Sequence, residues 1–125
     1  MPAPPSLLHG LPRHRRLQRP GEFAAAREHG RRVVSKCFIL NWMESKHAAL
    51  SRLGVVTSRK VGPAVVRNRA RRLLREVFRR HQHAIRGPLD IVLVARAPIA
   101  GRQFAEVERE YLAVLRRNAL TVSGP

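Results

Sequence analysis

The chain is poor in several residue types, and each shortage narrows what the protein can be. Cysteine occurs once, as Cys37, so an internal disulfide is impossible and a zinc site would need several other ligands. No stretch approaches the roughly 18 consecutive apolar residues of a membrane span. The first residues lack the apolar core of a secretory signal, although a basic targeting peptide stays open. A single domain in the reducing cytoplasm is therefore expected.

Acidic residues are also scarce, numbering only eight, and their spacing argues against catalysis by the chain itself. They form no paired-carboxylate pattern of the kind that a metal-dependent nuclease needs. Glu106 and Glu110 share a helical face, where acids early in a helix usually just complement its dipole. Asp90 is expected to be a turn residue or a local salt-bridge partner. His81 and His83 lie two positions apart and cannot face each other on a helix. The prediction is no catalytic residue and no metal ligand.

Basic residues, in contrast, dominate the composition. Lys and Arg total 25, for a net charge of +17, and only three of them are lysine. Such a chain attracts polyanions, and the planar guanidinium group suits phosphate contacts and stacking on bases. Nucleic acid is the leading expected partner, an anionic membrane surface is second, and no small-molecule substrate is indicated. A GC-rich genome would explain the preference for Arg over Lys but not the excess of positive charge.

Hydrophobic periodicity and turn residues outline one domain. A proline-rich disordered tail is predicted over 1–14, a folded domain over 15–120 and a C-terminal tail over 121–125. The predicted elements are a helix over 22–29, strands over 33–40 and 50–58, a helix over 63–84, a strand over 89–95 and a helix over 103–118. The polar segment 41–48 is expected to connect two strands, and Gly54 indicates a bulge or a close backbone approach. This α-β-β-α-β-α order predicts an α/β sandwich with helices packed on a small sheet.

The helix predicted over 63–84 carries the clearest functional signal. Its apolar stripe consists of Val66, Ala70, Leu73, Leu74, Val77 and Phe78. Between residues 59 and 80 there are nine basic residues and one acid, Glu76, so this span carries a charge of +8. A merely solvated helix face usually alternates the signs of its charges, and this one does not. The pattern predicts a polyanion-binding face opposite a stripe that packs into the core.

This segment also resembles a known family. V-G-P-A-V-V-R-N-R-A-R-R-L-L-R-E-V-F-R-R, from residue 61 to 80, is similar to the signature helix of the protein subunit of bacterial ribonuclease P, with Arg67-Asn68-Arg69 as its core. Three other segments match in order and spacing, namely Arg16-Leu17 with Glu22-Phe23, the stretch 53–62, and the stretch 89–96. The resemblance covers roughly residues 13–118.

The resemblance implies a fold and a division of labour. The family fold is α+β, a four-stranded central sheet with three helices in α-β-β-β-α-β-α order and a left-handed βαβ crossover, like the second domain of ribosomal protein S5. The family's holoenzyme is an endoribonuclease that removes the 5′ leader from precursor tRNA. Its chemistry belongs to Mg²⁺ bound by the catalytic RNA subunit, so the protein itself would bind no cofactor. The implied partners are that RNA subunit and the leader of the substrate, whose binding the protein broadens.

Two groups of residues acquire RNA-binding roles from this resemblance. The RNA subunit would contact Arg59, Lys60, Arg67, Asn68, Arg69, Arg71, Arg72, Arg75 and Arg79. The leader would lie in a cleft between the first helix and the sheet, lined by Phe23, Arg27 and Phe38. Arg27 and Asn41 stand where the family often has aromatic residues, so less stacking surface is expected, with Trp42 as a further candidate. Phe23 and Phe38 would also fit the hydrophobic core.

Three other classes fit part of the pattern. A ribosomal or general RNA-binding protein would have the same charge, but the four matched segments would then be accidental. A helix-turn-helix DNA regulator needs two helices in tandem, whereas predicted strands flank the basic helix. A membrane-active cationic protein needs a free apolar face, which a domain this small requires for its own core.

Overall fold

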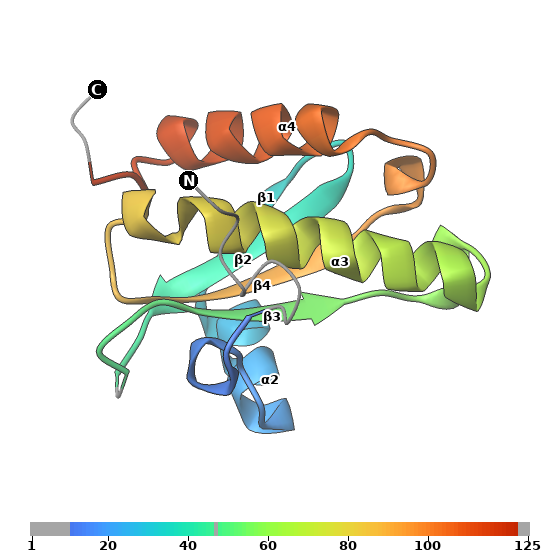
Figure 1. The fold of residues 1–125 in the computed structure, drawn as a ribbon. Helices are drawn as coiled ribbons and strands as arrows, with labels where there is room; N and C mark the ends of the chain where they lie inside the picture. Colours follow the sequence, from blue (N-terminus) through green and yellow to red (C-terminus); the bar gives the residue numbers. More distant parts are fainter. Residues whose placement is uncertain (1–10, 47, 123–125) are drawn as a thin grey trace.

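The computed structural model describes residues 11–46 and 48–122, which form one sheet with helices on both faces (Figure 1). The helices are α2 (Pro20–His29), α3 (Ala64–His81) and α4 (Phe104–Arg117). The strands are β1 (Arg31–Val34), β2 (Phe38–Glu44), β3 (Arg52–Val56) and β4 (Leu89–Ala95). Short 3-10 helices are η1 (Arg13–Arg15), η2 (Arg59–Val61), η3 (Gln82–Ala84) and η4 (Ala97–Ile99). This is the α+β architecture, in the same element order, that the resemblance implies.

The sheet has the strand order β1-β2-β4-β3. β2 pairs antiparallel with both β1 and β4, while β3 pairs parallel with β4. α3 connects the two parallel strands, which gives a βαβ unit. α3 and α4 lie on one face of the sheet and α2 lies on the other (Figure 1). Because helices cover both faces of β4, this central strand is almost continuously apolar.

The strand predicted over 33–40 is instead a β-hairpin. β1 ends within it, the chain reverses through Ser35–Cys37, and Phe38 begins β2, with the backbone N–H of Ser35 donating to the carbonyl of Phe38 over 2.8 Å. The prediction of a polar connection over 41–48 is also wrong at its start, since β2 continues to Glu44. These polar residues remain in a strand because β2 is an inner strand whose backbone is paired on both sides.

Hydrophobic clusters lie on both faces of the sheet. The larger one packs beneath α3 and α4, and its α3 members are Ala70, Leu74, Val77 and Phe78, with Val66 and Leu73 at the margin. These six residues are the predicted apolar stripe. The smaller cluster, under α2, has only Leu17, Ala26 and Val92 at its centre. Since α2 is short, it leaves part of this sheet face uncovered.

The folded region extends beyond the predicted boundaries at residues 15 and 120. Leu11 is buried in the larger cluster, and the Nε of buried Arg15 donates to the carbonyl of Ser51 over 2.8 Å. At the other end, Thr121 forms an antiparallel β-bridge with Ile85. The predicted tail residues 1–10 and 123–125 lie outside the described residues.

Candidate nucleic-acid interface

The polar residues of α3 lie in three rows around the helix. From the β3 side to the α4 side the rows are Arg67, Arg71 and Arg75, then Asn68, Arg72 and Arg79, then Arg69 and Arg80. Asn68 and Arg72 are exposed, and the side chain of Asn68 accepts a hydrogen bond of 2.8 Å from Arg71. The residues of the predicted binding face therefore lie on the side of α3 away from the core, but their side chains point in different directions.

Two of the predicted RNA-binding arginines have partners inside the protein. Nη2 of Arg69 donates to the carbonyl oxygen of Arg102, 2.6 Å away, just before α4. Arg79 donates twice to Glu76, over 2.8 and 2.7 Å, and Arg80 donates to the same carboxylate over 2.8 Å. The hydrogen bond from Arg79 is the main reason why the pKa of Glu76 is lowered, against the opposing effect of burial. Among the described residues, the arginines of α3 that hydrogen-bond neither to an acid nor to a backbone carbonyl are thus Arg67, Arg71, Arg72 and Arg75.

Arg59 and Lys60 extend the basic surface ahead of α3. Both are exposed in η2, which turns into the helix through Gly62. Gly62 has a φ of 147°, a backbone conformation that residues with a side chain rarely adopt. The glycine is therefore what allows the chain to present these two cations and then start the helix.

An ion-pair network largely removed from solvent fixes α2 to the sheet. Arg52 on β3 donates to both carboxylate oxygens of Asp90, over 3.0 and 2.9 Å, and to Glu22 over 2.7 Å. The other oxygen of Glu22 accepts the backbone N–H groups of Gln18 and Arg19, so this residue also caps α2. Burial raises the pKa of Glu22, but these hydrogen bonds outweigh it and the pKa is lowered. Asp90 is thus a strand residue with a distant partner, not a turn residue.

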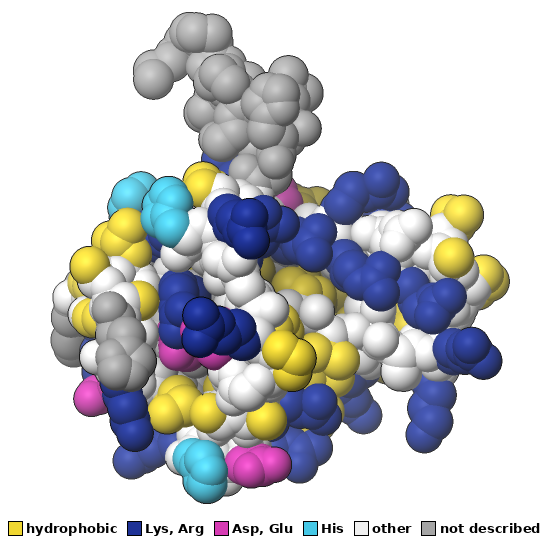
Figure 2. Space-filling view, turned by 90° about the horizontal axis from the view of Figure 1, so that it is seen from below, with side chains coloured by type: hydrophobic (Ala, Val, Ile, Leu, Met, Phe, Trp, Pro, Cys, Tyr) yellow, Lys and Arg dark blue, Asp and Glu magenta, His cyan; other side chains and the backbone are white. Residues whose placement is uncertain are grey.

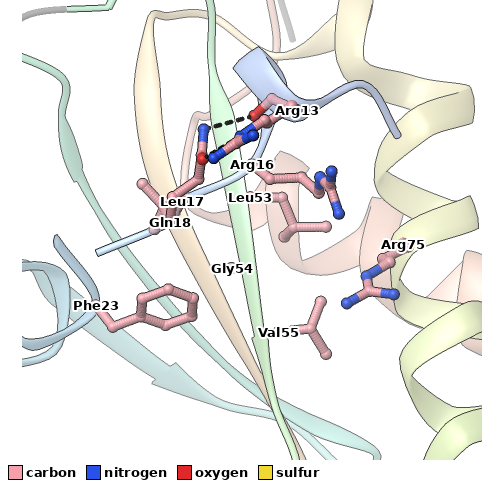
Figure 3. Close-up of a pocket in the computed structure, with 9 residues that line it drawn as sticks. All are labelled: Arg13, Arg16, Leu17, Gln18, Phe23, Leu53, Gly54, Val55 and Arg75. Carbon is pink, nitrogen blue, oxygen red and sulfur yellow. Dashed lines mark hydrogen bonds between the residues drawn. The ribbon is translucent and has the colours of Figure 1, made fainter. Parts of the chain in front are cut away.

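A first hollow, of about 280 Å³, opens over β3 between η1, α2 and α3 (Figure 3). We call it the β3 hollow. Its floor is β3, and the ring of Phe23 lies so close to Gly54 that a Cβ at that position would overlap the ring. At Gly54, where the sequence predicts a bulge or a close backbone approach, the close neighbour is a side-chain ring. Arg16 and Arg75 enter the hollow from opposite sides, as Figure 3 shows.

A second hollow, of about 380 Å³, lies beside α2 on the sheet face that this helix covers, and we call it the α2 groove. Arg27 lines it from the helix, Ile39, Asn41 and Val94 from the sheet, and Arg32 from the edge strand β1. Figure 2 shows the molecule from the α2 side, with apolar side chains lying between groups of Lys and Arg. The floor is largely apolar, and the edges carry two arginines and one acid, Glu28, an arrangement that suits the bases and the backbone of a single strand.

Phe38 belongs to neither hollow, which corrects one predicted leader-binding residue. Its side chain is fully buried on the opposite face of the sheet, edge-on to the ring of Tyr111 with centroids 6.3 Å apart. Trp42 lies in the same larger cluster and is 7% exposed. The reason is the alternation along β2, in which Phe38 and Trp42 point to α4 while Ile39 and Asn41 point to α2.

The structure also separates Phe23 from Arg27 and adds residues that the sequence did not indicate. Phe23 lines the β3 hollow, whereas Arg27 lines the α2 groove, although the two share one helix. Ile39 could have been found from strand alternation if the limits of β2 had been known. The sequence does not indicate that Arg16 and Arg75 line the same hollow, because only tertiary packing brings these two segments close.

Neither a metal-ligating cluster nor a membrane-spanning helix is found in the described part of the molecule. Residues 11–46 and 48–122 hold no group of three or more His, Cys, Asp or Glu that could ligate a metal ion. In the same residues, no helix is long and apolar enough to cross a bilayer. The hollows and the basic helix instead offer cations and apolar surface together.

A small α+β domain with an uncompensated basic helix and two arginine-lined hollows, one at the β3 edge of the sheet and one beside α2, is a nucleic-acid-binding protein. The family model for ribonuclease P matches residues 11–119. The chain belongs to the family of bacterial ribonuclease P protein components, RNA-binding subunits of the ribonucleoprotein that processes tRNA. The resemblance noted from the sequence is confirmed.

Relatives and solved structures agree with this assignment. The ribonuclease P protein component of Desulfovibrio desulfuricans is 43% identical over 117 residues, which cover 91% of this chain and 90% of the relative. The RNase P protein of Staphylococcus aureus has a TM-score of 0.77 at 27% identity, covering 85% of this chain and 96% of its own. That of Thermotoga maritima has a TM-score of 0.73 at 29% identity, covering 87% and 98%.

Proposed function

We propose that the protein is the accessory subunit of a cytoplasmic holoenzyme that removes the 5′ leader from precursor tRNA, and that it holds the catalytic RNA subunit against the stretch of α3 from Arg67 to Arg75. The observation that carries this proposal is the row Arg67, Arg71 and Arg75 with exposed Arg72 beside it, none paired with an acid in the described residues. The apolar stripe of the same helix is already buried in the core. RNA binding would therefore require no unfolding of the domain.

The leader of the substrate would lie in the α2 groove. Ile39 and Val94 supply apolar contact for bases, while Arg27 and Arg32 are placed to contact phosphates or to stack. Base stacking is worth about 1–3 kcal/mol per base and is tolerant of sequence. Arg27 would replace the aromatic side chain that the family often has there, so that the groove accepts varied leaders.

Hydrolysis, in this proposal, would belong to the RNA subunit, and magnesium ions bound there would supply the chemistry. Of the acids near the hollows, Glu22 caps α2 and pairs with Arg52, and Glu76 holds two arginines. Glu28, at the edge of the α2 groove, lies 3.9 Å from the imidazole of His29. The protein would contribute binding and orientation. Pure, RNA-free protein incubated with precursor tRNA and magnesium should leave it intact, and adding the RNA subunit should give cleavage at the mature 5′ end. Cleavage at that position by the protein alone would contradict this division of labour.

The role of α3 can be tested by removing charge there and elsewhere in equal amounts. Arg71, Arg72 and Arg75 replaced together by Ala should weaken binding of the RNA subunit. The slope of log K against log salt should become shallower by about 0.7–0.9 for each phosphate that the variant no longer neutralises. The matched control replaces three exposed arginines of α4, namely Arg109, Arg116 and Arg117. Equal losses of affinity in the two triple variants would mean that net charge, and not the α3 face, determines binding.

The role of the α2 groove can be tested with Arg27→Ala. The holoenzyme with this variant should bind precursor tRNA more weakly, bind mature tRNA as before, and assemble with the RNA subunit normally. Arg27→Phe should recover part of the loss if stacking is the role and little of it if phosphate contact is. Arg117→Ala serves as the single-charge control. Equal weakening for precursor and mature tRNA would place Arg27 outside the path of the leader.

A further inference from the structure

Two guanidinium groups face each other across the β3 hollow. Arg16 reaches it from the extended segment after η1, and Arg75 reaches it from the middle of α3 (Figure 3). Within residues 11–46 and 48–122, neither side chain has a hydrogen-bond or ion-pair partner. Each guanidinium therefore has its full set of N–H donors available for a ligand.

The surroundings of these two groups do not balance their charge. Burial, followed by the positive charges of Arg16 and Arg71, lowers the pKa of Arg75. No carboxylate lines the hollow, and the acids nearest in sequence, Glu22 and Glu76, are held by other arginines. Like charges brought together at one hollow favour binding of an anion that neutralises them.

The backbone holds Arg16 in position before any ligand binds. Arg16 forms a parallel β-bridge with Leu53, and the backbone N–H of Leu17 donates to the Leu53 carbonyl over 2.8 Å. A 2.7 Å hydrogen bond from Nε of Arg13 to the side chain of Gln18, drawn in Figure 3, joins residues on either side of Arg16. One arginine is thus fixed on the edge of β3 and the other on a packed helix, which suits two-sided capture of a single tetrahedral anion.

We propose that the β3 hollow is a phosphate-binding site in which Arg16 and Arg75 together hold one phosphodiester group of the RNA subunit. The proposal rests on the proposed function of α3 and adds to it a second contact, from the N-terminal segment. Because one phosphate would join η1 to α3, RNA binding would fasten this segment onto the signature helix. A free phosphate has the same chemistry as the phosphodiester, so the test has separate arms for the two.

The first arm uses inorganic phosphate as the probe and thermal unfolding as the readout, at constant ionic strength with chloride as the alternative anion. Phosphate should raise the unfolding midpoint of the unmodified protein and of the control Arg117→Gln. The rise should be half or less in Arg16→Gln, whose midpoint in chloride should be no lower than that of the unmodified protein, because repulsion is relieved. Arg16 is exposed, so this substitution leaves the core intact. A full phosphate response in Arg16→Gln would overturn the site.

The second arm measures affinity for the RNA subunit in a double-mutant cycle. Arg16→Gln and Arg75→Gln should each weaken binding about tenfold, as expected when one charge-assisted hydrogen bond is removed. The double variant should lose clearly less than the hundredfold product, since both side chains serve one phosphate. The same cycle with Arg72 in place of Arg75 should be additive. Additive losses for Arg16 and Arg75, or no loss in Arg16→Gln, would overturn the inference while leaving the role of α3 standing. If Arg72→Gln and Arg75→Gln both bound the RNA subunit with unchanged affinity, the proposed function itself would be refuted.

Discussion

Replacing Arg52 by Met would remove the cation that ties α2 to the sheet, and its cost follows from the burial of the groups left behind. Asp90 would lose two hydrogen bonds while remaining only 8% exposed. Breaking a fully buried pair costs about 3–5 kcal/mol, and losing an exposed pair costs at most about 1. The three side chains of the network are 12–26% exposed, so the expected loss lies between these limits, at about 2–3 kcal/mol.

Urea and thermal unfolding measure this loss directly. For a domain of this size, about 2–3 kcal/mol corresponds to a fall in midpoint of roughly 6–15 °C. Arg31→Met is the matched control, since it removes an exposed arginine from the edge strand β1. A loss below about 1 kcal/mol, or one equal to that of Arg31→Met, would refute the reasoning that burial makes this network strong. Because α2 forms one wall of the α2 groove, the same variant should weaken binding of precursor tRNA more than assembly with the RNA subunit.

Three further predictions concern Glu22, Phe38 and Gly54. The pKa of Glu22 is lowered in the folded protein, so its contribution to the free energy of unfolding is complete above the ordinary value of 4.5 and is lost as the pH falls through the lowered value. Urea titrations at successive pH values should therefore show that Glu22→Gln loses less stability in acid than the unmodified protein. An unchanged pH profile in this variant would contradict the role given to Glu22. Phe38→Ala should cost about 3–5 kcal/mol but leave the ratio of precursor to mature tRNA binding unchanged, unlike Arg27→Ala, and a changed ratio would return Phe38 to the leader path. Gly54→Ala should push the Phe23 ring off β3 and lower the free energy of unfolding by about 1–3 kcal/mol. Adding Phe23→Leu should restore part of this loss, and an unaltered urea midpoint in Gly54→Ala would contradict the close packing.

Local patterns were sufficient where an element's own residues decide it. β4 has the predicted bounds, because a short, nearly continuous apolar run can only be buried on both faces. α3 buries the predicted stripe, since a 3.6-residue period is visible without knowledge of the partners. The sequence did not predict the hairpin between β1 and β2, because β2 continues into the polar segment that begins at Asn41. That segment stays in a strand only because β4 pairs alongside it.

The candidate site was predictable in part for the same reason. Composition and the run of basic residues located the RNA-binding helix, but they could not show that Arg69 and Arg79 are engaged inside the protein. The family resemblance placed Phe38 in the leader cleft, and the sequence left its side of the sheet undecided. Along a strand the side chains alternate, so an uncertain boundary leaves the buried face undecided.

The sequence by itself determined the charge, the amphipathic basic helix, the family and the absence of any catalytic pattern, because each of these depends on residue type or on short-range spacing. Only the tertiary structure decided which side chains share a hollow. Arg16 and Arg75 line one hollow, and Arg52 donates hydrogen bonds to both Glu22 and Asp90, because packing of the sheet against its helices brings distant segments together. Such contacts are set by strand order and register, which involve the whole chain at once, and no local window of sequence contains them.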